Sequence, residues 1–403
     1  MQMRFIPAEG SGITQAVRAG DLVLIGGLMP VDESGAVIGS SLSSQATFVF
    51  DALKRVLAEA GATLADVVKH NVYLSGEGPF SNVDEAIAEL DGVRAAYFDS
   101  PGPTSTEIFC GMEREGVFLV LDAWVIVGGK RELLSPPGHW NWKSKLPFVH
   151  GWKVGDMIFT GGQRSLNRSG HLLGAGDIEI QTDEAFRNLD TLLRTAGGDR
   201  HSLMRQNTYF RFFGQGAEVT SYWEKMTNVR RRYMSIPSAA GAGLRVTSLP
   251  GADELIQVEG IGVLGENKQR LQPANHWDWS IPGSEFTQGW KIGNLGFIGG
   301  QISADNKAHA VGHDMETQTR NVFTFIRRVL AEGGMTEANV AKLYIYYHAD
   351  GGWAEIARAR AIIESVQREF YGTPGPAVTA VRVSGFAFED LLIEIEAVAV
   401  TGD

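Results

Sequence analysis

Hydrophobic and polar positions follow the same order three times along the chain. A strand-like run that ends in two glycines occupies residues 20–27, and matching runs occupy residues 155–162 and 293–300. The copies are therefore 135 and 138 residues apart. A period of this kind is typical of a repeated structural unit rather than of one large domain.

Each run is followed, about twenty residues later, by apolar residues at helical spacing, such as Val49, Leu53, Val56 and Leu57 in the first copy. A β-branched strand, a second helix (about 80–98, 222–234 and 353–371) and two further strands complete each copy. We therefore expect three β-β-α-β-α-β-β units, with a short turn between the last two strands. The first helix of each unit begins near a glutamine and ends at a glycine: Gln45 and Gly61, Gln181 and Gly197, Gln318 and Gly333.

The unit boundaries are expected in two polar, proline-containing stretches, residues 129–138 and 264–275. They divide the chain into units of residues 1–130, 131–268 and 269–403. Each unit has the length of an ordinary domain.

Composition and charge narrow the functional classes. The 403 residues are 44% hydrophobic, which is enough for a sizeable core. The net charge is −11, and the longest basic run is Arg230–Arg232, so nucleic-acid binding is disfavoured. The chain has one cysteine, and it lacks both an apolar leader and an 18-residue apolar stretch. We expect a cytoplasmic protein without a membrane partner.

Two unit boundaries lead into similar tryptophan-rich segments, residues 139–142 (His-Trp-Asn-Trp) and 276–279 (His-Trp-Asp-Trp). One interpretation is that these side chains line a cavity. The other is that each segment is an arm whose indoles cover a neighbouring unit. The pattern alone leaves both open.

Several motifs together resemble the Rid family (YjgF/YER057c/UK114). They are the Gly-Gly-Gln of residues 161–163 and 299–301, the glutamine-led helix, the Val-Val-Lys strand at residues 67–69 and the closing strand at residues 394–400. The resemblance implies an α+β, chorismate-mutase-like module in which a mixed sheet packs on two helices. It also implies trimers with ligand clefts between subunits. Three fused copies would then form an intrachain pseudo-trimer with three non-equivalent clefts, because tethering raises the effective concentration of neighbouring units.

The family's deaminases imply a set of site residues, which the three copies match only in part. The arginine that holds the substrate carboxylate is missing from the equivalent segments 103–106, 239–242 and 376–379. The glutamate of the last strand survives only as Glu394, with Val120 and Gln257 in its place elsewhere. An aromatic position near the first strand carries Ile13, Phe148 and Phe286.

Two other arginines, Arg245 and Arg382, lie on the cleft-facing side of the strands that precede the last strands, by the period of two. If the final hairpin turns near Phe388, Arg382 faces Glu394, and the same arithmetic pairs Arg245 with Gln257. A functional pair would hold an anionic substrate and activate water. A structural pair would be a cross-strand ion pair worth about 0.2–1 kcal/mol.

We predict Glu394 as the catalytic residue and the following as substrate-binding residues: Arg382, Arg245, Gln257, Phe148, Phe286, Gly161 and Gly299. The two glycines let a backbone approach a neighbour or a ligand closely. No metal site is expected, because His309 and His313 are separated by a loop that contains Gly312. No cofactor is expected either.

The expected function is hydrolysis of a small, anionic, nitrogen-containing metabolite of the imine or enamine type in a cleft between units. The alternative is a non-catalytic binding or sensing protein that has lost the family's arginine. The expected partner is a small-molecule metabolite, and two pseudo-trimers could stack as a homodimer.

Overall fold

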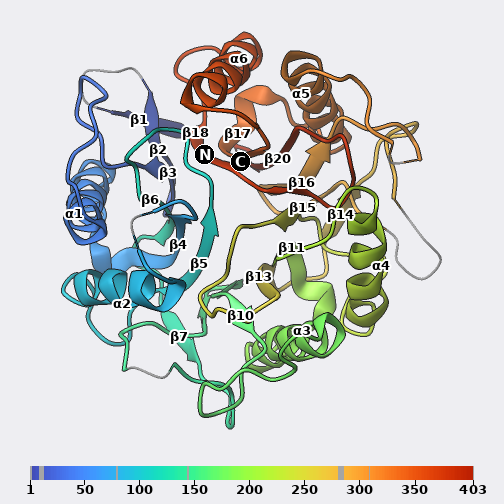
Figure 1. Ribbon diagram of the computed structural model, residues 1–403. Helices are drawn as coiled ribbons and strands as arrows, with labels where there is room; N and C mark the ends of the chain where they lie inside the picture. Colours follow the sequence, from blue (N-terminus) through green and yellow to red (C-terminus); the bar gives the residue numbers. More distant parts are fainter. Residues whose placement is uncertain are drawn as a thin grey trace.

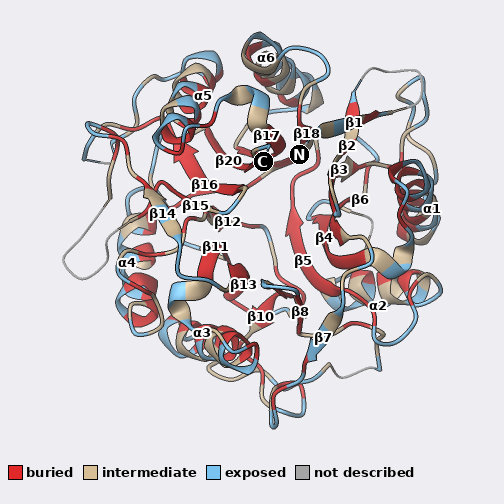
Figure 2. Cartoon of the chain, turned by 180° about the vertical axis from the view of Figure 1, so that it is seen from behind, coloured by how far each residue is buried: buried red, intermediate tan, exposed pale blue. Residues whose placement is uncertain are grey.

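Three sheets, each covered by two helices, form a closed ring (Figure 1). The computed structural model describes residues 2–8, 13–78, 80–142, 145–279, 286–307 and 309–402. Helices α1 to α6 lie on the outside of the ring and the sheets lie within it. Figure 2 shows that buried residues gather on the strands and on the inner sides of the helices. None of the helices in these ranges is long and apolar enough to cross a membrane.

Module 1 contains a six-stranded sheet with the order β1-β2-β3-β6-β4-β5. Its elements are β1 (Met3–Pro7), β2 (Thr14–Ala19), β3 (Leu22–Leu28), α1 (Leu42–Ala60), β4 (Val67–Ser75), α2 (Val83–Arg94), β5 (Thr104–Cys110) and β6 (Leu119–Ile126).

Module 2 has an eight-stranded sheet, because it takes up one short strand of module 3. Its own elements are β7 (Arg131–Leu134), β8 (Gly151–Val154), β9 (Met157–Thr160), β10 (Gln163–Arg164), α3 (Ile178–Thr195), β11 (Leu203–Phe210), α4 (Glu218–Arg230), β12 (Gly243–Arg245) and β13 (Ile256–Val263).

Module 3 repeats the order of module 1 as β14-β15-β16-β20-β17-β18. Its elements are β14 (Lys268–Leu271), β15 (Gly289–Ile292), β16 (Leu295–Ile302), α5 (Met315–Glu332), β17 (Val340–Tyr347), α6 (Trp353–Tyr371), β18 (Ala377–Arg382), β19 (Gly385–Phe386) and β20 (Ile393–Val400). The three-module α+β fold and the intrachain pseudo-trimer are confirmed. Each module also has a leading strand (β1, β7 or β14) that the predicted order lacks.

The predicted final hairpin is wrong. In module 3, β17 lies between the two last long strands, parallel to β18 and antiparallel to β20. Arg382 is therefore beside Tyr347, whereas Glu394 is opposite Tyr346. A helix between two strands makes a crossover that places them side by side and parallel, so the last strand must pair on the other side of β17.

The same correction applies to the other two modules. In module 2, Arg245 lies beside Phe210, and Gln257 lies opposite Tyr209. Arg382 is consequently not the cross-strand partner of Glu394, and Arg245 is not that of Gln257. In module 1, the strands that carry residues 109 and 120 are separated by β4 in the same way.

A buried glutamine ties the first helix of each module to its last long strand. The side-chain carbonyl accepts a backbone N–H from just before or at the start of that strand, and its amide donates to loop carbonyls. This accounts for the glutamine that opens each predicted helix. The carbonyl pairs are Gln45 with Phe118 (2.7 Å), Gln181 with Leu255 (2.8 Å) and Gln318 with Leu392 (2.8 Å).

Adjacent modules meet at three seams, which we call seam 1–2, seam 2–3 and seam 3–1. At each seam a glycine in or just after the third strand of one module lies against the backbone of the neighbouring module. A methyl group on Gly161 would lie 2.7 Å from the Ser105 carbonyl oxygen, and one on Gly299 would lie 3.0 Å from the Gly241 nitrogen. A side chain at these positions would crowd the neighbouring backbone, so the first glycine of each Gly-Gly pair allows the modules to pack closely.

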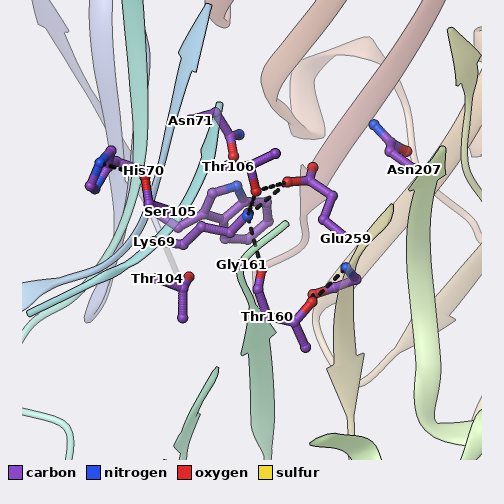
Figure 3. A network of polar contacts seen from close by, with 12 residues as sticks. Lys69, His70, Asn71, Thr104, Ser105, Thr106, Thr160, Gly161, Asn207 and Glu259 are labelled. Carbon is purple, nitrogen blue, oxygen red and sulfur yellow. Dashed lines mark hydrogen bonds and ion pairs between the residues drawn. The ribbon is translucent and has the colours of Figure 1, made fainter. Parts of the chain in front are cut away.

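Three buried ion pairs connect the modules near the centre of the ring. Each joins a basic residue of one module to an acidic residue of another. Figure 3 shows the first pair, in which Lys69 also donates to the Thr106 hydroxyl and the Thr160 carbonyl. The pairs are Lys69–Glu259 (2.7 Å), Arg205–Glu396 (2.7 Å) and Lys342–Asp122 (3.8 Å).

Candidate ligand site between modules 2 and 3

Seam 2–3 contains a pocket whose walls come from both modules. Module 2 contributes α4 and the start of β12. Module 3 contributes the tryptophan-rich segment before β15, the loop after β19, and β20. The pocket is open to solvent on one side, and its wall combines aromatic side chains with a few polar groups, as small-molecule sites do.

Glu394 lies in the wall of this pocket and is 6% exposed. Burial raises the pKa of its carboxyl well above 4.5, and the negative charge of Glu396 raises it further. A backbone hydrogen bond from Gly243 opposes the shift only partly. Burial therefore favours the neutral, protonated form of Glu394, and in that form the carboxyl group can donate a proton.

Glycine at position 300 makes room for this carboxyl group. A methyl group on Gly300 would lie 1.8 Å from the Glu394 Oε1. The second glycine of the Gly-Gly pair thus makes room for a side chain of the pocket wall, whereas the first, Gly299, lies against the backbone of module 2.

Aromatic rings form most of the remaining wall. Trp279 lies 6.1 Å from Trp223 and 5.5 Å from Phe388 between ring centroids, and Trp277 lies 4.9 Å from Phe286. Trp277 and Trp279 therefore line the pocket, and Trp279 also covers the core of module 2, so both interpretations of this segment apply. Trp140 and Trp142 of the other tryptophan-rich segment pack around a histidine of their own module, and Trp142 also packs against the core of module 1.

Arg230 is the one arginine among the described residues of the pocket wall, and it is not among the site residues predicted from the sequence. It ends α4, is 6% exposed, and its guanidinium lies 4.1 Å from the centre of the Trp223 ring. Within the described ranges no acidic side chain pairs with it, and its Nε is buried without a hydrogen-bond partner. Burial lowers the pKa of Arg230 to about 9, so the side chain remains a cation at neutral pH.

Seam 1–2 is filled by the protein's own groups. Arg94 pairs there with Glu107, donates to the Ser105 hydroxyl (3.0 Å) and contacts Asp91 (2.6 Å). Burial alone would raise the pKa of Glu107, but Arg94 and the Ser105 hydroxyl lower it to about 2.

Two predicted substrate-binding residues lie in this filled seam. Phe148 packs under the Arg94 guanidinium at 4.1 Å, and the Gln257 amide donates to the Glu107 carbonyl (3.1 Å). Gly161 also lies here, against Ser105. The structure therefore does not bring these three residues to Glu394.

The two predicted arginines lie at the outer edges of seams. Arg245 donates to the Ser384 carbonyl (3.0 Å) at seam 2–3, and Arg382 pairs with Glu77 (2.9 Å) at seam 3–1. Of the predicted substrate-binding residues, only Phe286 shares the pocket wall with Glu394. Among the described residues no group of three or more His, Cys, Asp or Glu could hold a metal ion.

Three separate regions of the chain, residues 7–101, 141–263 and 280–401, match the family model described as Endoribonuclease L-PSP. RutC family proteins of Pyrococcus horikoshii and Pyrococcus abyssi are each 35% identical, over 119 and 80 residues. These matches cover 29% and 20% of this chain, and 88% and 63% of those proteins.

The Reactive Intermediate Deaminase A, chloroplastic, of Arabidopsis thaliana is 29% identical over 98 residues. This match covers 24% of this chain and 49% of that protein, so the chain spans about half of its length. The crystal structure of a chorismatase matches with a TM-score of 0.52 and 14% identity, over 83% of this chain and 93% of that one. This last match shows a shared fold over most of the chain.

Proposed function

Because the chain belongs to the Rid family, whose model is described as Endoribonuclease L-PSP, we propose that it hydrolyses a small, anionic, nitrogen-containing metabolite of the imine or enamine type in the pocket of seam 2–3. The observation that carries the proposal is Glu394, a buried carboxyl group in the pocket wall whose pKa is raised by burial. One relative bears the name of a reactive intermediate deaminase, which supports this class of chemistry.

The proposed reaction uses Glu394 as general acid. Its proton goes to the carbon end of an enamine, or to the nitrogen of an imine, and leaves an iminium ion. Water adds to the iminium carbon, the carbinolamine loses ammonia, and the product is a carbonyl compound. The Glu394 carboxylate takes back a proton released by the water, so the net change is addition of one water and release of one ammonia.

Seam 2–3 supports this chemistry better than the other two. At seam 1–2 the position of Glu394 is taken by Gln257, and Arg94 is already bound to Glu107. At seam 3–1 the position of Glu394 is taken by Val120. The Val120 side chain lies next to Gly27, where a methyl group would be 2.9 Å from it. Neither of those positions can donate a proton. We accordingly propose one active seam for each chain.

The test is turnover by the purified full chain. A panel of imines, generated in the assay from amino acids with small and with ring-containing side chains, is incubated with the protein, and ammonia and carbonyl product are measured. We expect turnover by the wild type. Glu394→Gln should lower kcat by at least about 100-fold, since a general acid typically raises the rate by a factor of about 10²–10⁴. Glu369→Gln, an exposed change on α6, serves as the matched control and retains full activity.

No turnover with any member of the panel, together with a rise in Tm on adding one of them, would refute the hydrolase proposal. That outcome would favour the alternative, a binding or sensing protein, because a ligand that binds only the folded state raises its stability. We expect no nucleic-acid substrate, since the net charge of the chain is −11 and the described pocket wall contains a single arginine among aromatic rings.

A further inference from the structure

Arg94 and Arg230 occupy the same position in modules 1 and 2. Each is the last residue of the second helix, and each stands seven residues before a proline, Pro101 or Pro237. Both guanidiniums are buried, and both lie 4.1 Å from an aromatic ring centre. Module 1 is therefore an internal reference for module 2.

The partners of Arg94 are all absent around Arg230. The same spacing that gives Asp91, Ser105 and Glu107 in module 1 gives Thr227, Gly241 and Gly243 in module 2. Two of the three replacements are glycines that line the pocket. Module 2 thus keeps the cation and lacks each group that satisfies it in module 1.

We propose that Arg230 binds the carboxylate of the ligand, and that the ligand is a flat, unsaturated ring acid rather than a three-carbon imine. In module 1 the equivalent guanidinium, Arg94, binds the Glu107 carboxylate beside Ser105. In module 2 a methyl group on Gly243 would lie 2.4 Å from the Trp223 ring, so the ligand's carboxylate would reach Arg230 from the pocket and not from the position of the Glu107 side chain. The identity of the reaction rests on the proposed function, but binding by Arg230 does not.

Electrostatics favour this assignment. Among the residues that the structure describes, no acidic side chain pairs with the nearly dehydrated Arg230 guanidinium, which is unfavourable in the empty protein. The planar fork of the guanidinium suits a carboxylate. In module 3 the residue seven positions before Pro374 is Gln367, so seam 3–1 has no cation at the equivalent place. Within the described part of the chain, seam 2–3 alone combines this cation with room for an anion.

The ring component follows from the aromatic wall. Trp223 and Trp279 offer flat faces next to the arginine, and Phe388 continues that wall. Such faces gain most from a flat, apolar partner. A three-carbon acid bound to Arg230 would leave most of this aromatic wall uncovered.

Isothermal titration with probes that cannot react tests binding separately from turnover. The probes are benzoate, its neutral analogue benzamide, and pyruvate as a small acyclic acid. We expect the wild type to bind benzoate at least about 30-fold more tightly than benzamide, since removing one partner of a desolvated charge pair costs about 2 kcal/mol or more. Pyruvate should bind at least about 10-fold more weakly than benzoate, because it cannot contact the aromatic wall with a ring. This factor corresponds to a loss of about 1.4 kcal/mol of binding free energy.

Arg230→Met should bind benzoate and benzamide equally, whereas Arg232→Met, an exposed neighbour, should behave as the wild type. Wild-type benzoate affinity in Arg230→Met, no preference for benzoate over benzamide, or no binding at all would each overturn the proposal. Equal affinity for pyruvate would overturn its ring component. If benzoate binds as expected but no imine is hydrolysed, the proposed function fails while this assignment stands.

A stability comparison guards against a folding defect. Arg230→Met removes an unpaired cation, so its Tm should equal or exceed that of the wild type. Arg94→Met leaves the buried Glu107 carboxylate without its cationic partner and should lower Tm markedly. A similar fall in both variants would show that Arg230 is satisfied within the protein, which contradicts the proposal.

Discussion

The ion pair between Lys69 and Glu259 should hold modules 1 and 2 together, and replacing its acidic member tests this directly. Glu259 is 1% exposed and lies 2.7 Å from the Lys69 ammonium. It also accepts from the hydroxyls of Thr106 (2.6 Å) and Tyr209 (3.1 Å). Glu259→Gln preserves the shape and removes the charge.

The expected loss follows from burial. Lys69 is fully buried, and burial lowers its pKa while the Glu259 charge opposes that shift. Removing one partner of a buried pair costs about 3–5 kcal/mol, because the other charge is left uncompensated. Glu369→Gln, which breaks the exposed Arg320–Glu369 pair (2.6 Å), should cost less than about 1 kcal/mol.

A double-mutant cycle separates the pair from other effects. The double variant Lys69→Met, Glu259→Gln removes both charges, so it should be more stable than the sum of the single losses implies by about 2–3 kcal/mol. Urea unfolding followed by far-UV circular dichroism and by tryptophan fluorescence gives the free energies, provided that the two transitions coincide. Equal costs for Glu259→Gln and Glu369→Gln, or strictly additive single losses, would refute the reasoning.

Further predictions concern the seam and pH. Gly161→Ala would place a methyl group 2.7 Å from the Ser105 carbonyl and should lower stability by about 1–3 kcal/mol in urea unfolding; an unchanged midpoint would contradict the close approach. Because the pKa of Glu394 is raised from 4.5, the folded protein keeps a proton that the unfolded chain releases, so stability falls as the pH rises from 4.5 through the folded-state pKa. Glu394→Gln should flatten this decline of Tm with pH, and an identical decline in both proteins would argue against a neutral carboxyl. Burial lowers the pKa of His70 to about 3, so stability should also fall as the pH drops from 6.5 towards 3, and His70→Phe should lessen that loss in acid-unfolding curves.

The repeat and the module type could be predicted from the sequence, because glycine-bounded strands and glutamine-led helices depend on local spacing. The strand pairing could not. The neighbour of β18 is β17 and not β20. This order follows from the crossover connection through α6, which the spacing of apolar residues does not reveal. The leading strands were missed because edge strands such as β7 carry charged residues, Arg131 and Glu132, and resemble linkers.

The candidate site could be predicted only in part. Glu394 and Phe286 were found by their place in the repeat, and both lie in the pocket wall. Arg230 was missed because it comes from a helix, whereas the expected arginine belongs to a strand. Arg230 and Arg94 each stand seven residues before a proline, so an alignment of the modules on these prolines pairs the two arginines. Even so, only the structure shows that Arg94 is satisfied and Arg230 is not.

A crystal structure of the full chain with bound benzoate tests the central claim most directly. The account predicts benzoate in seam 2–3, with its carboxylate on Arg230 and its ring against the aromatic wall that includes Trp279. Benzoate at seam 1–2 or seam 3–1, or an empty seam 2–3 at saturating concentration, would contradict it.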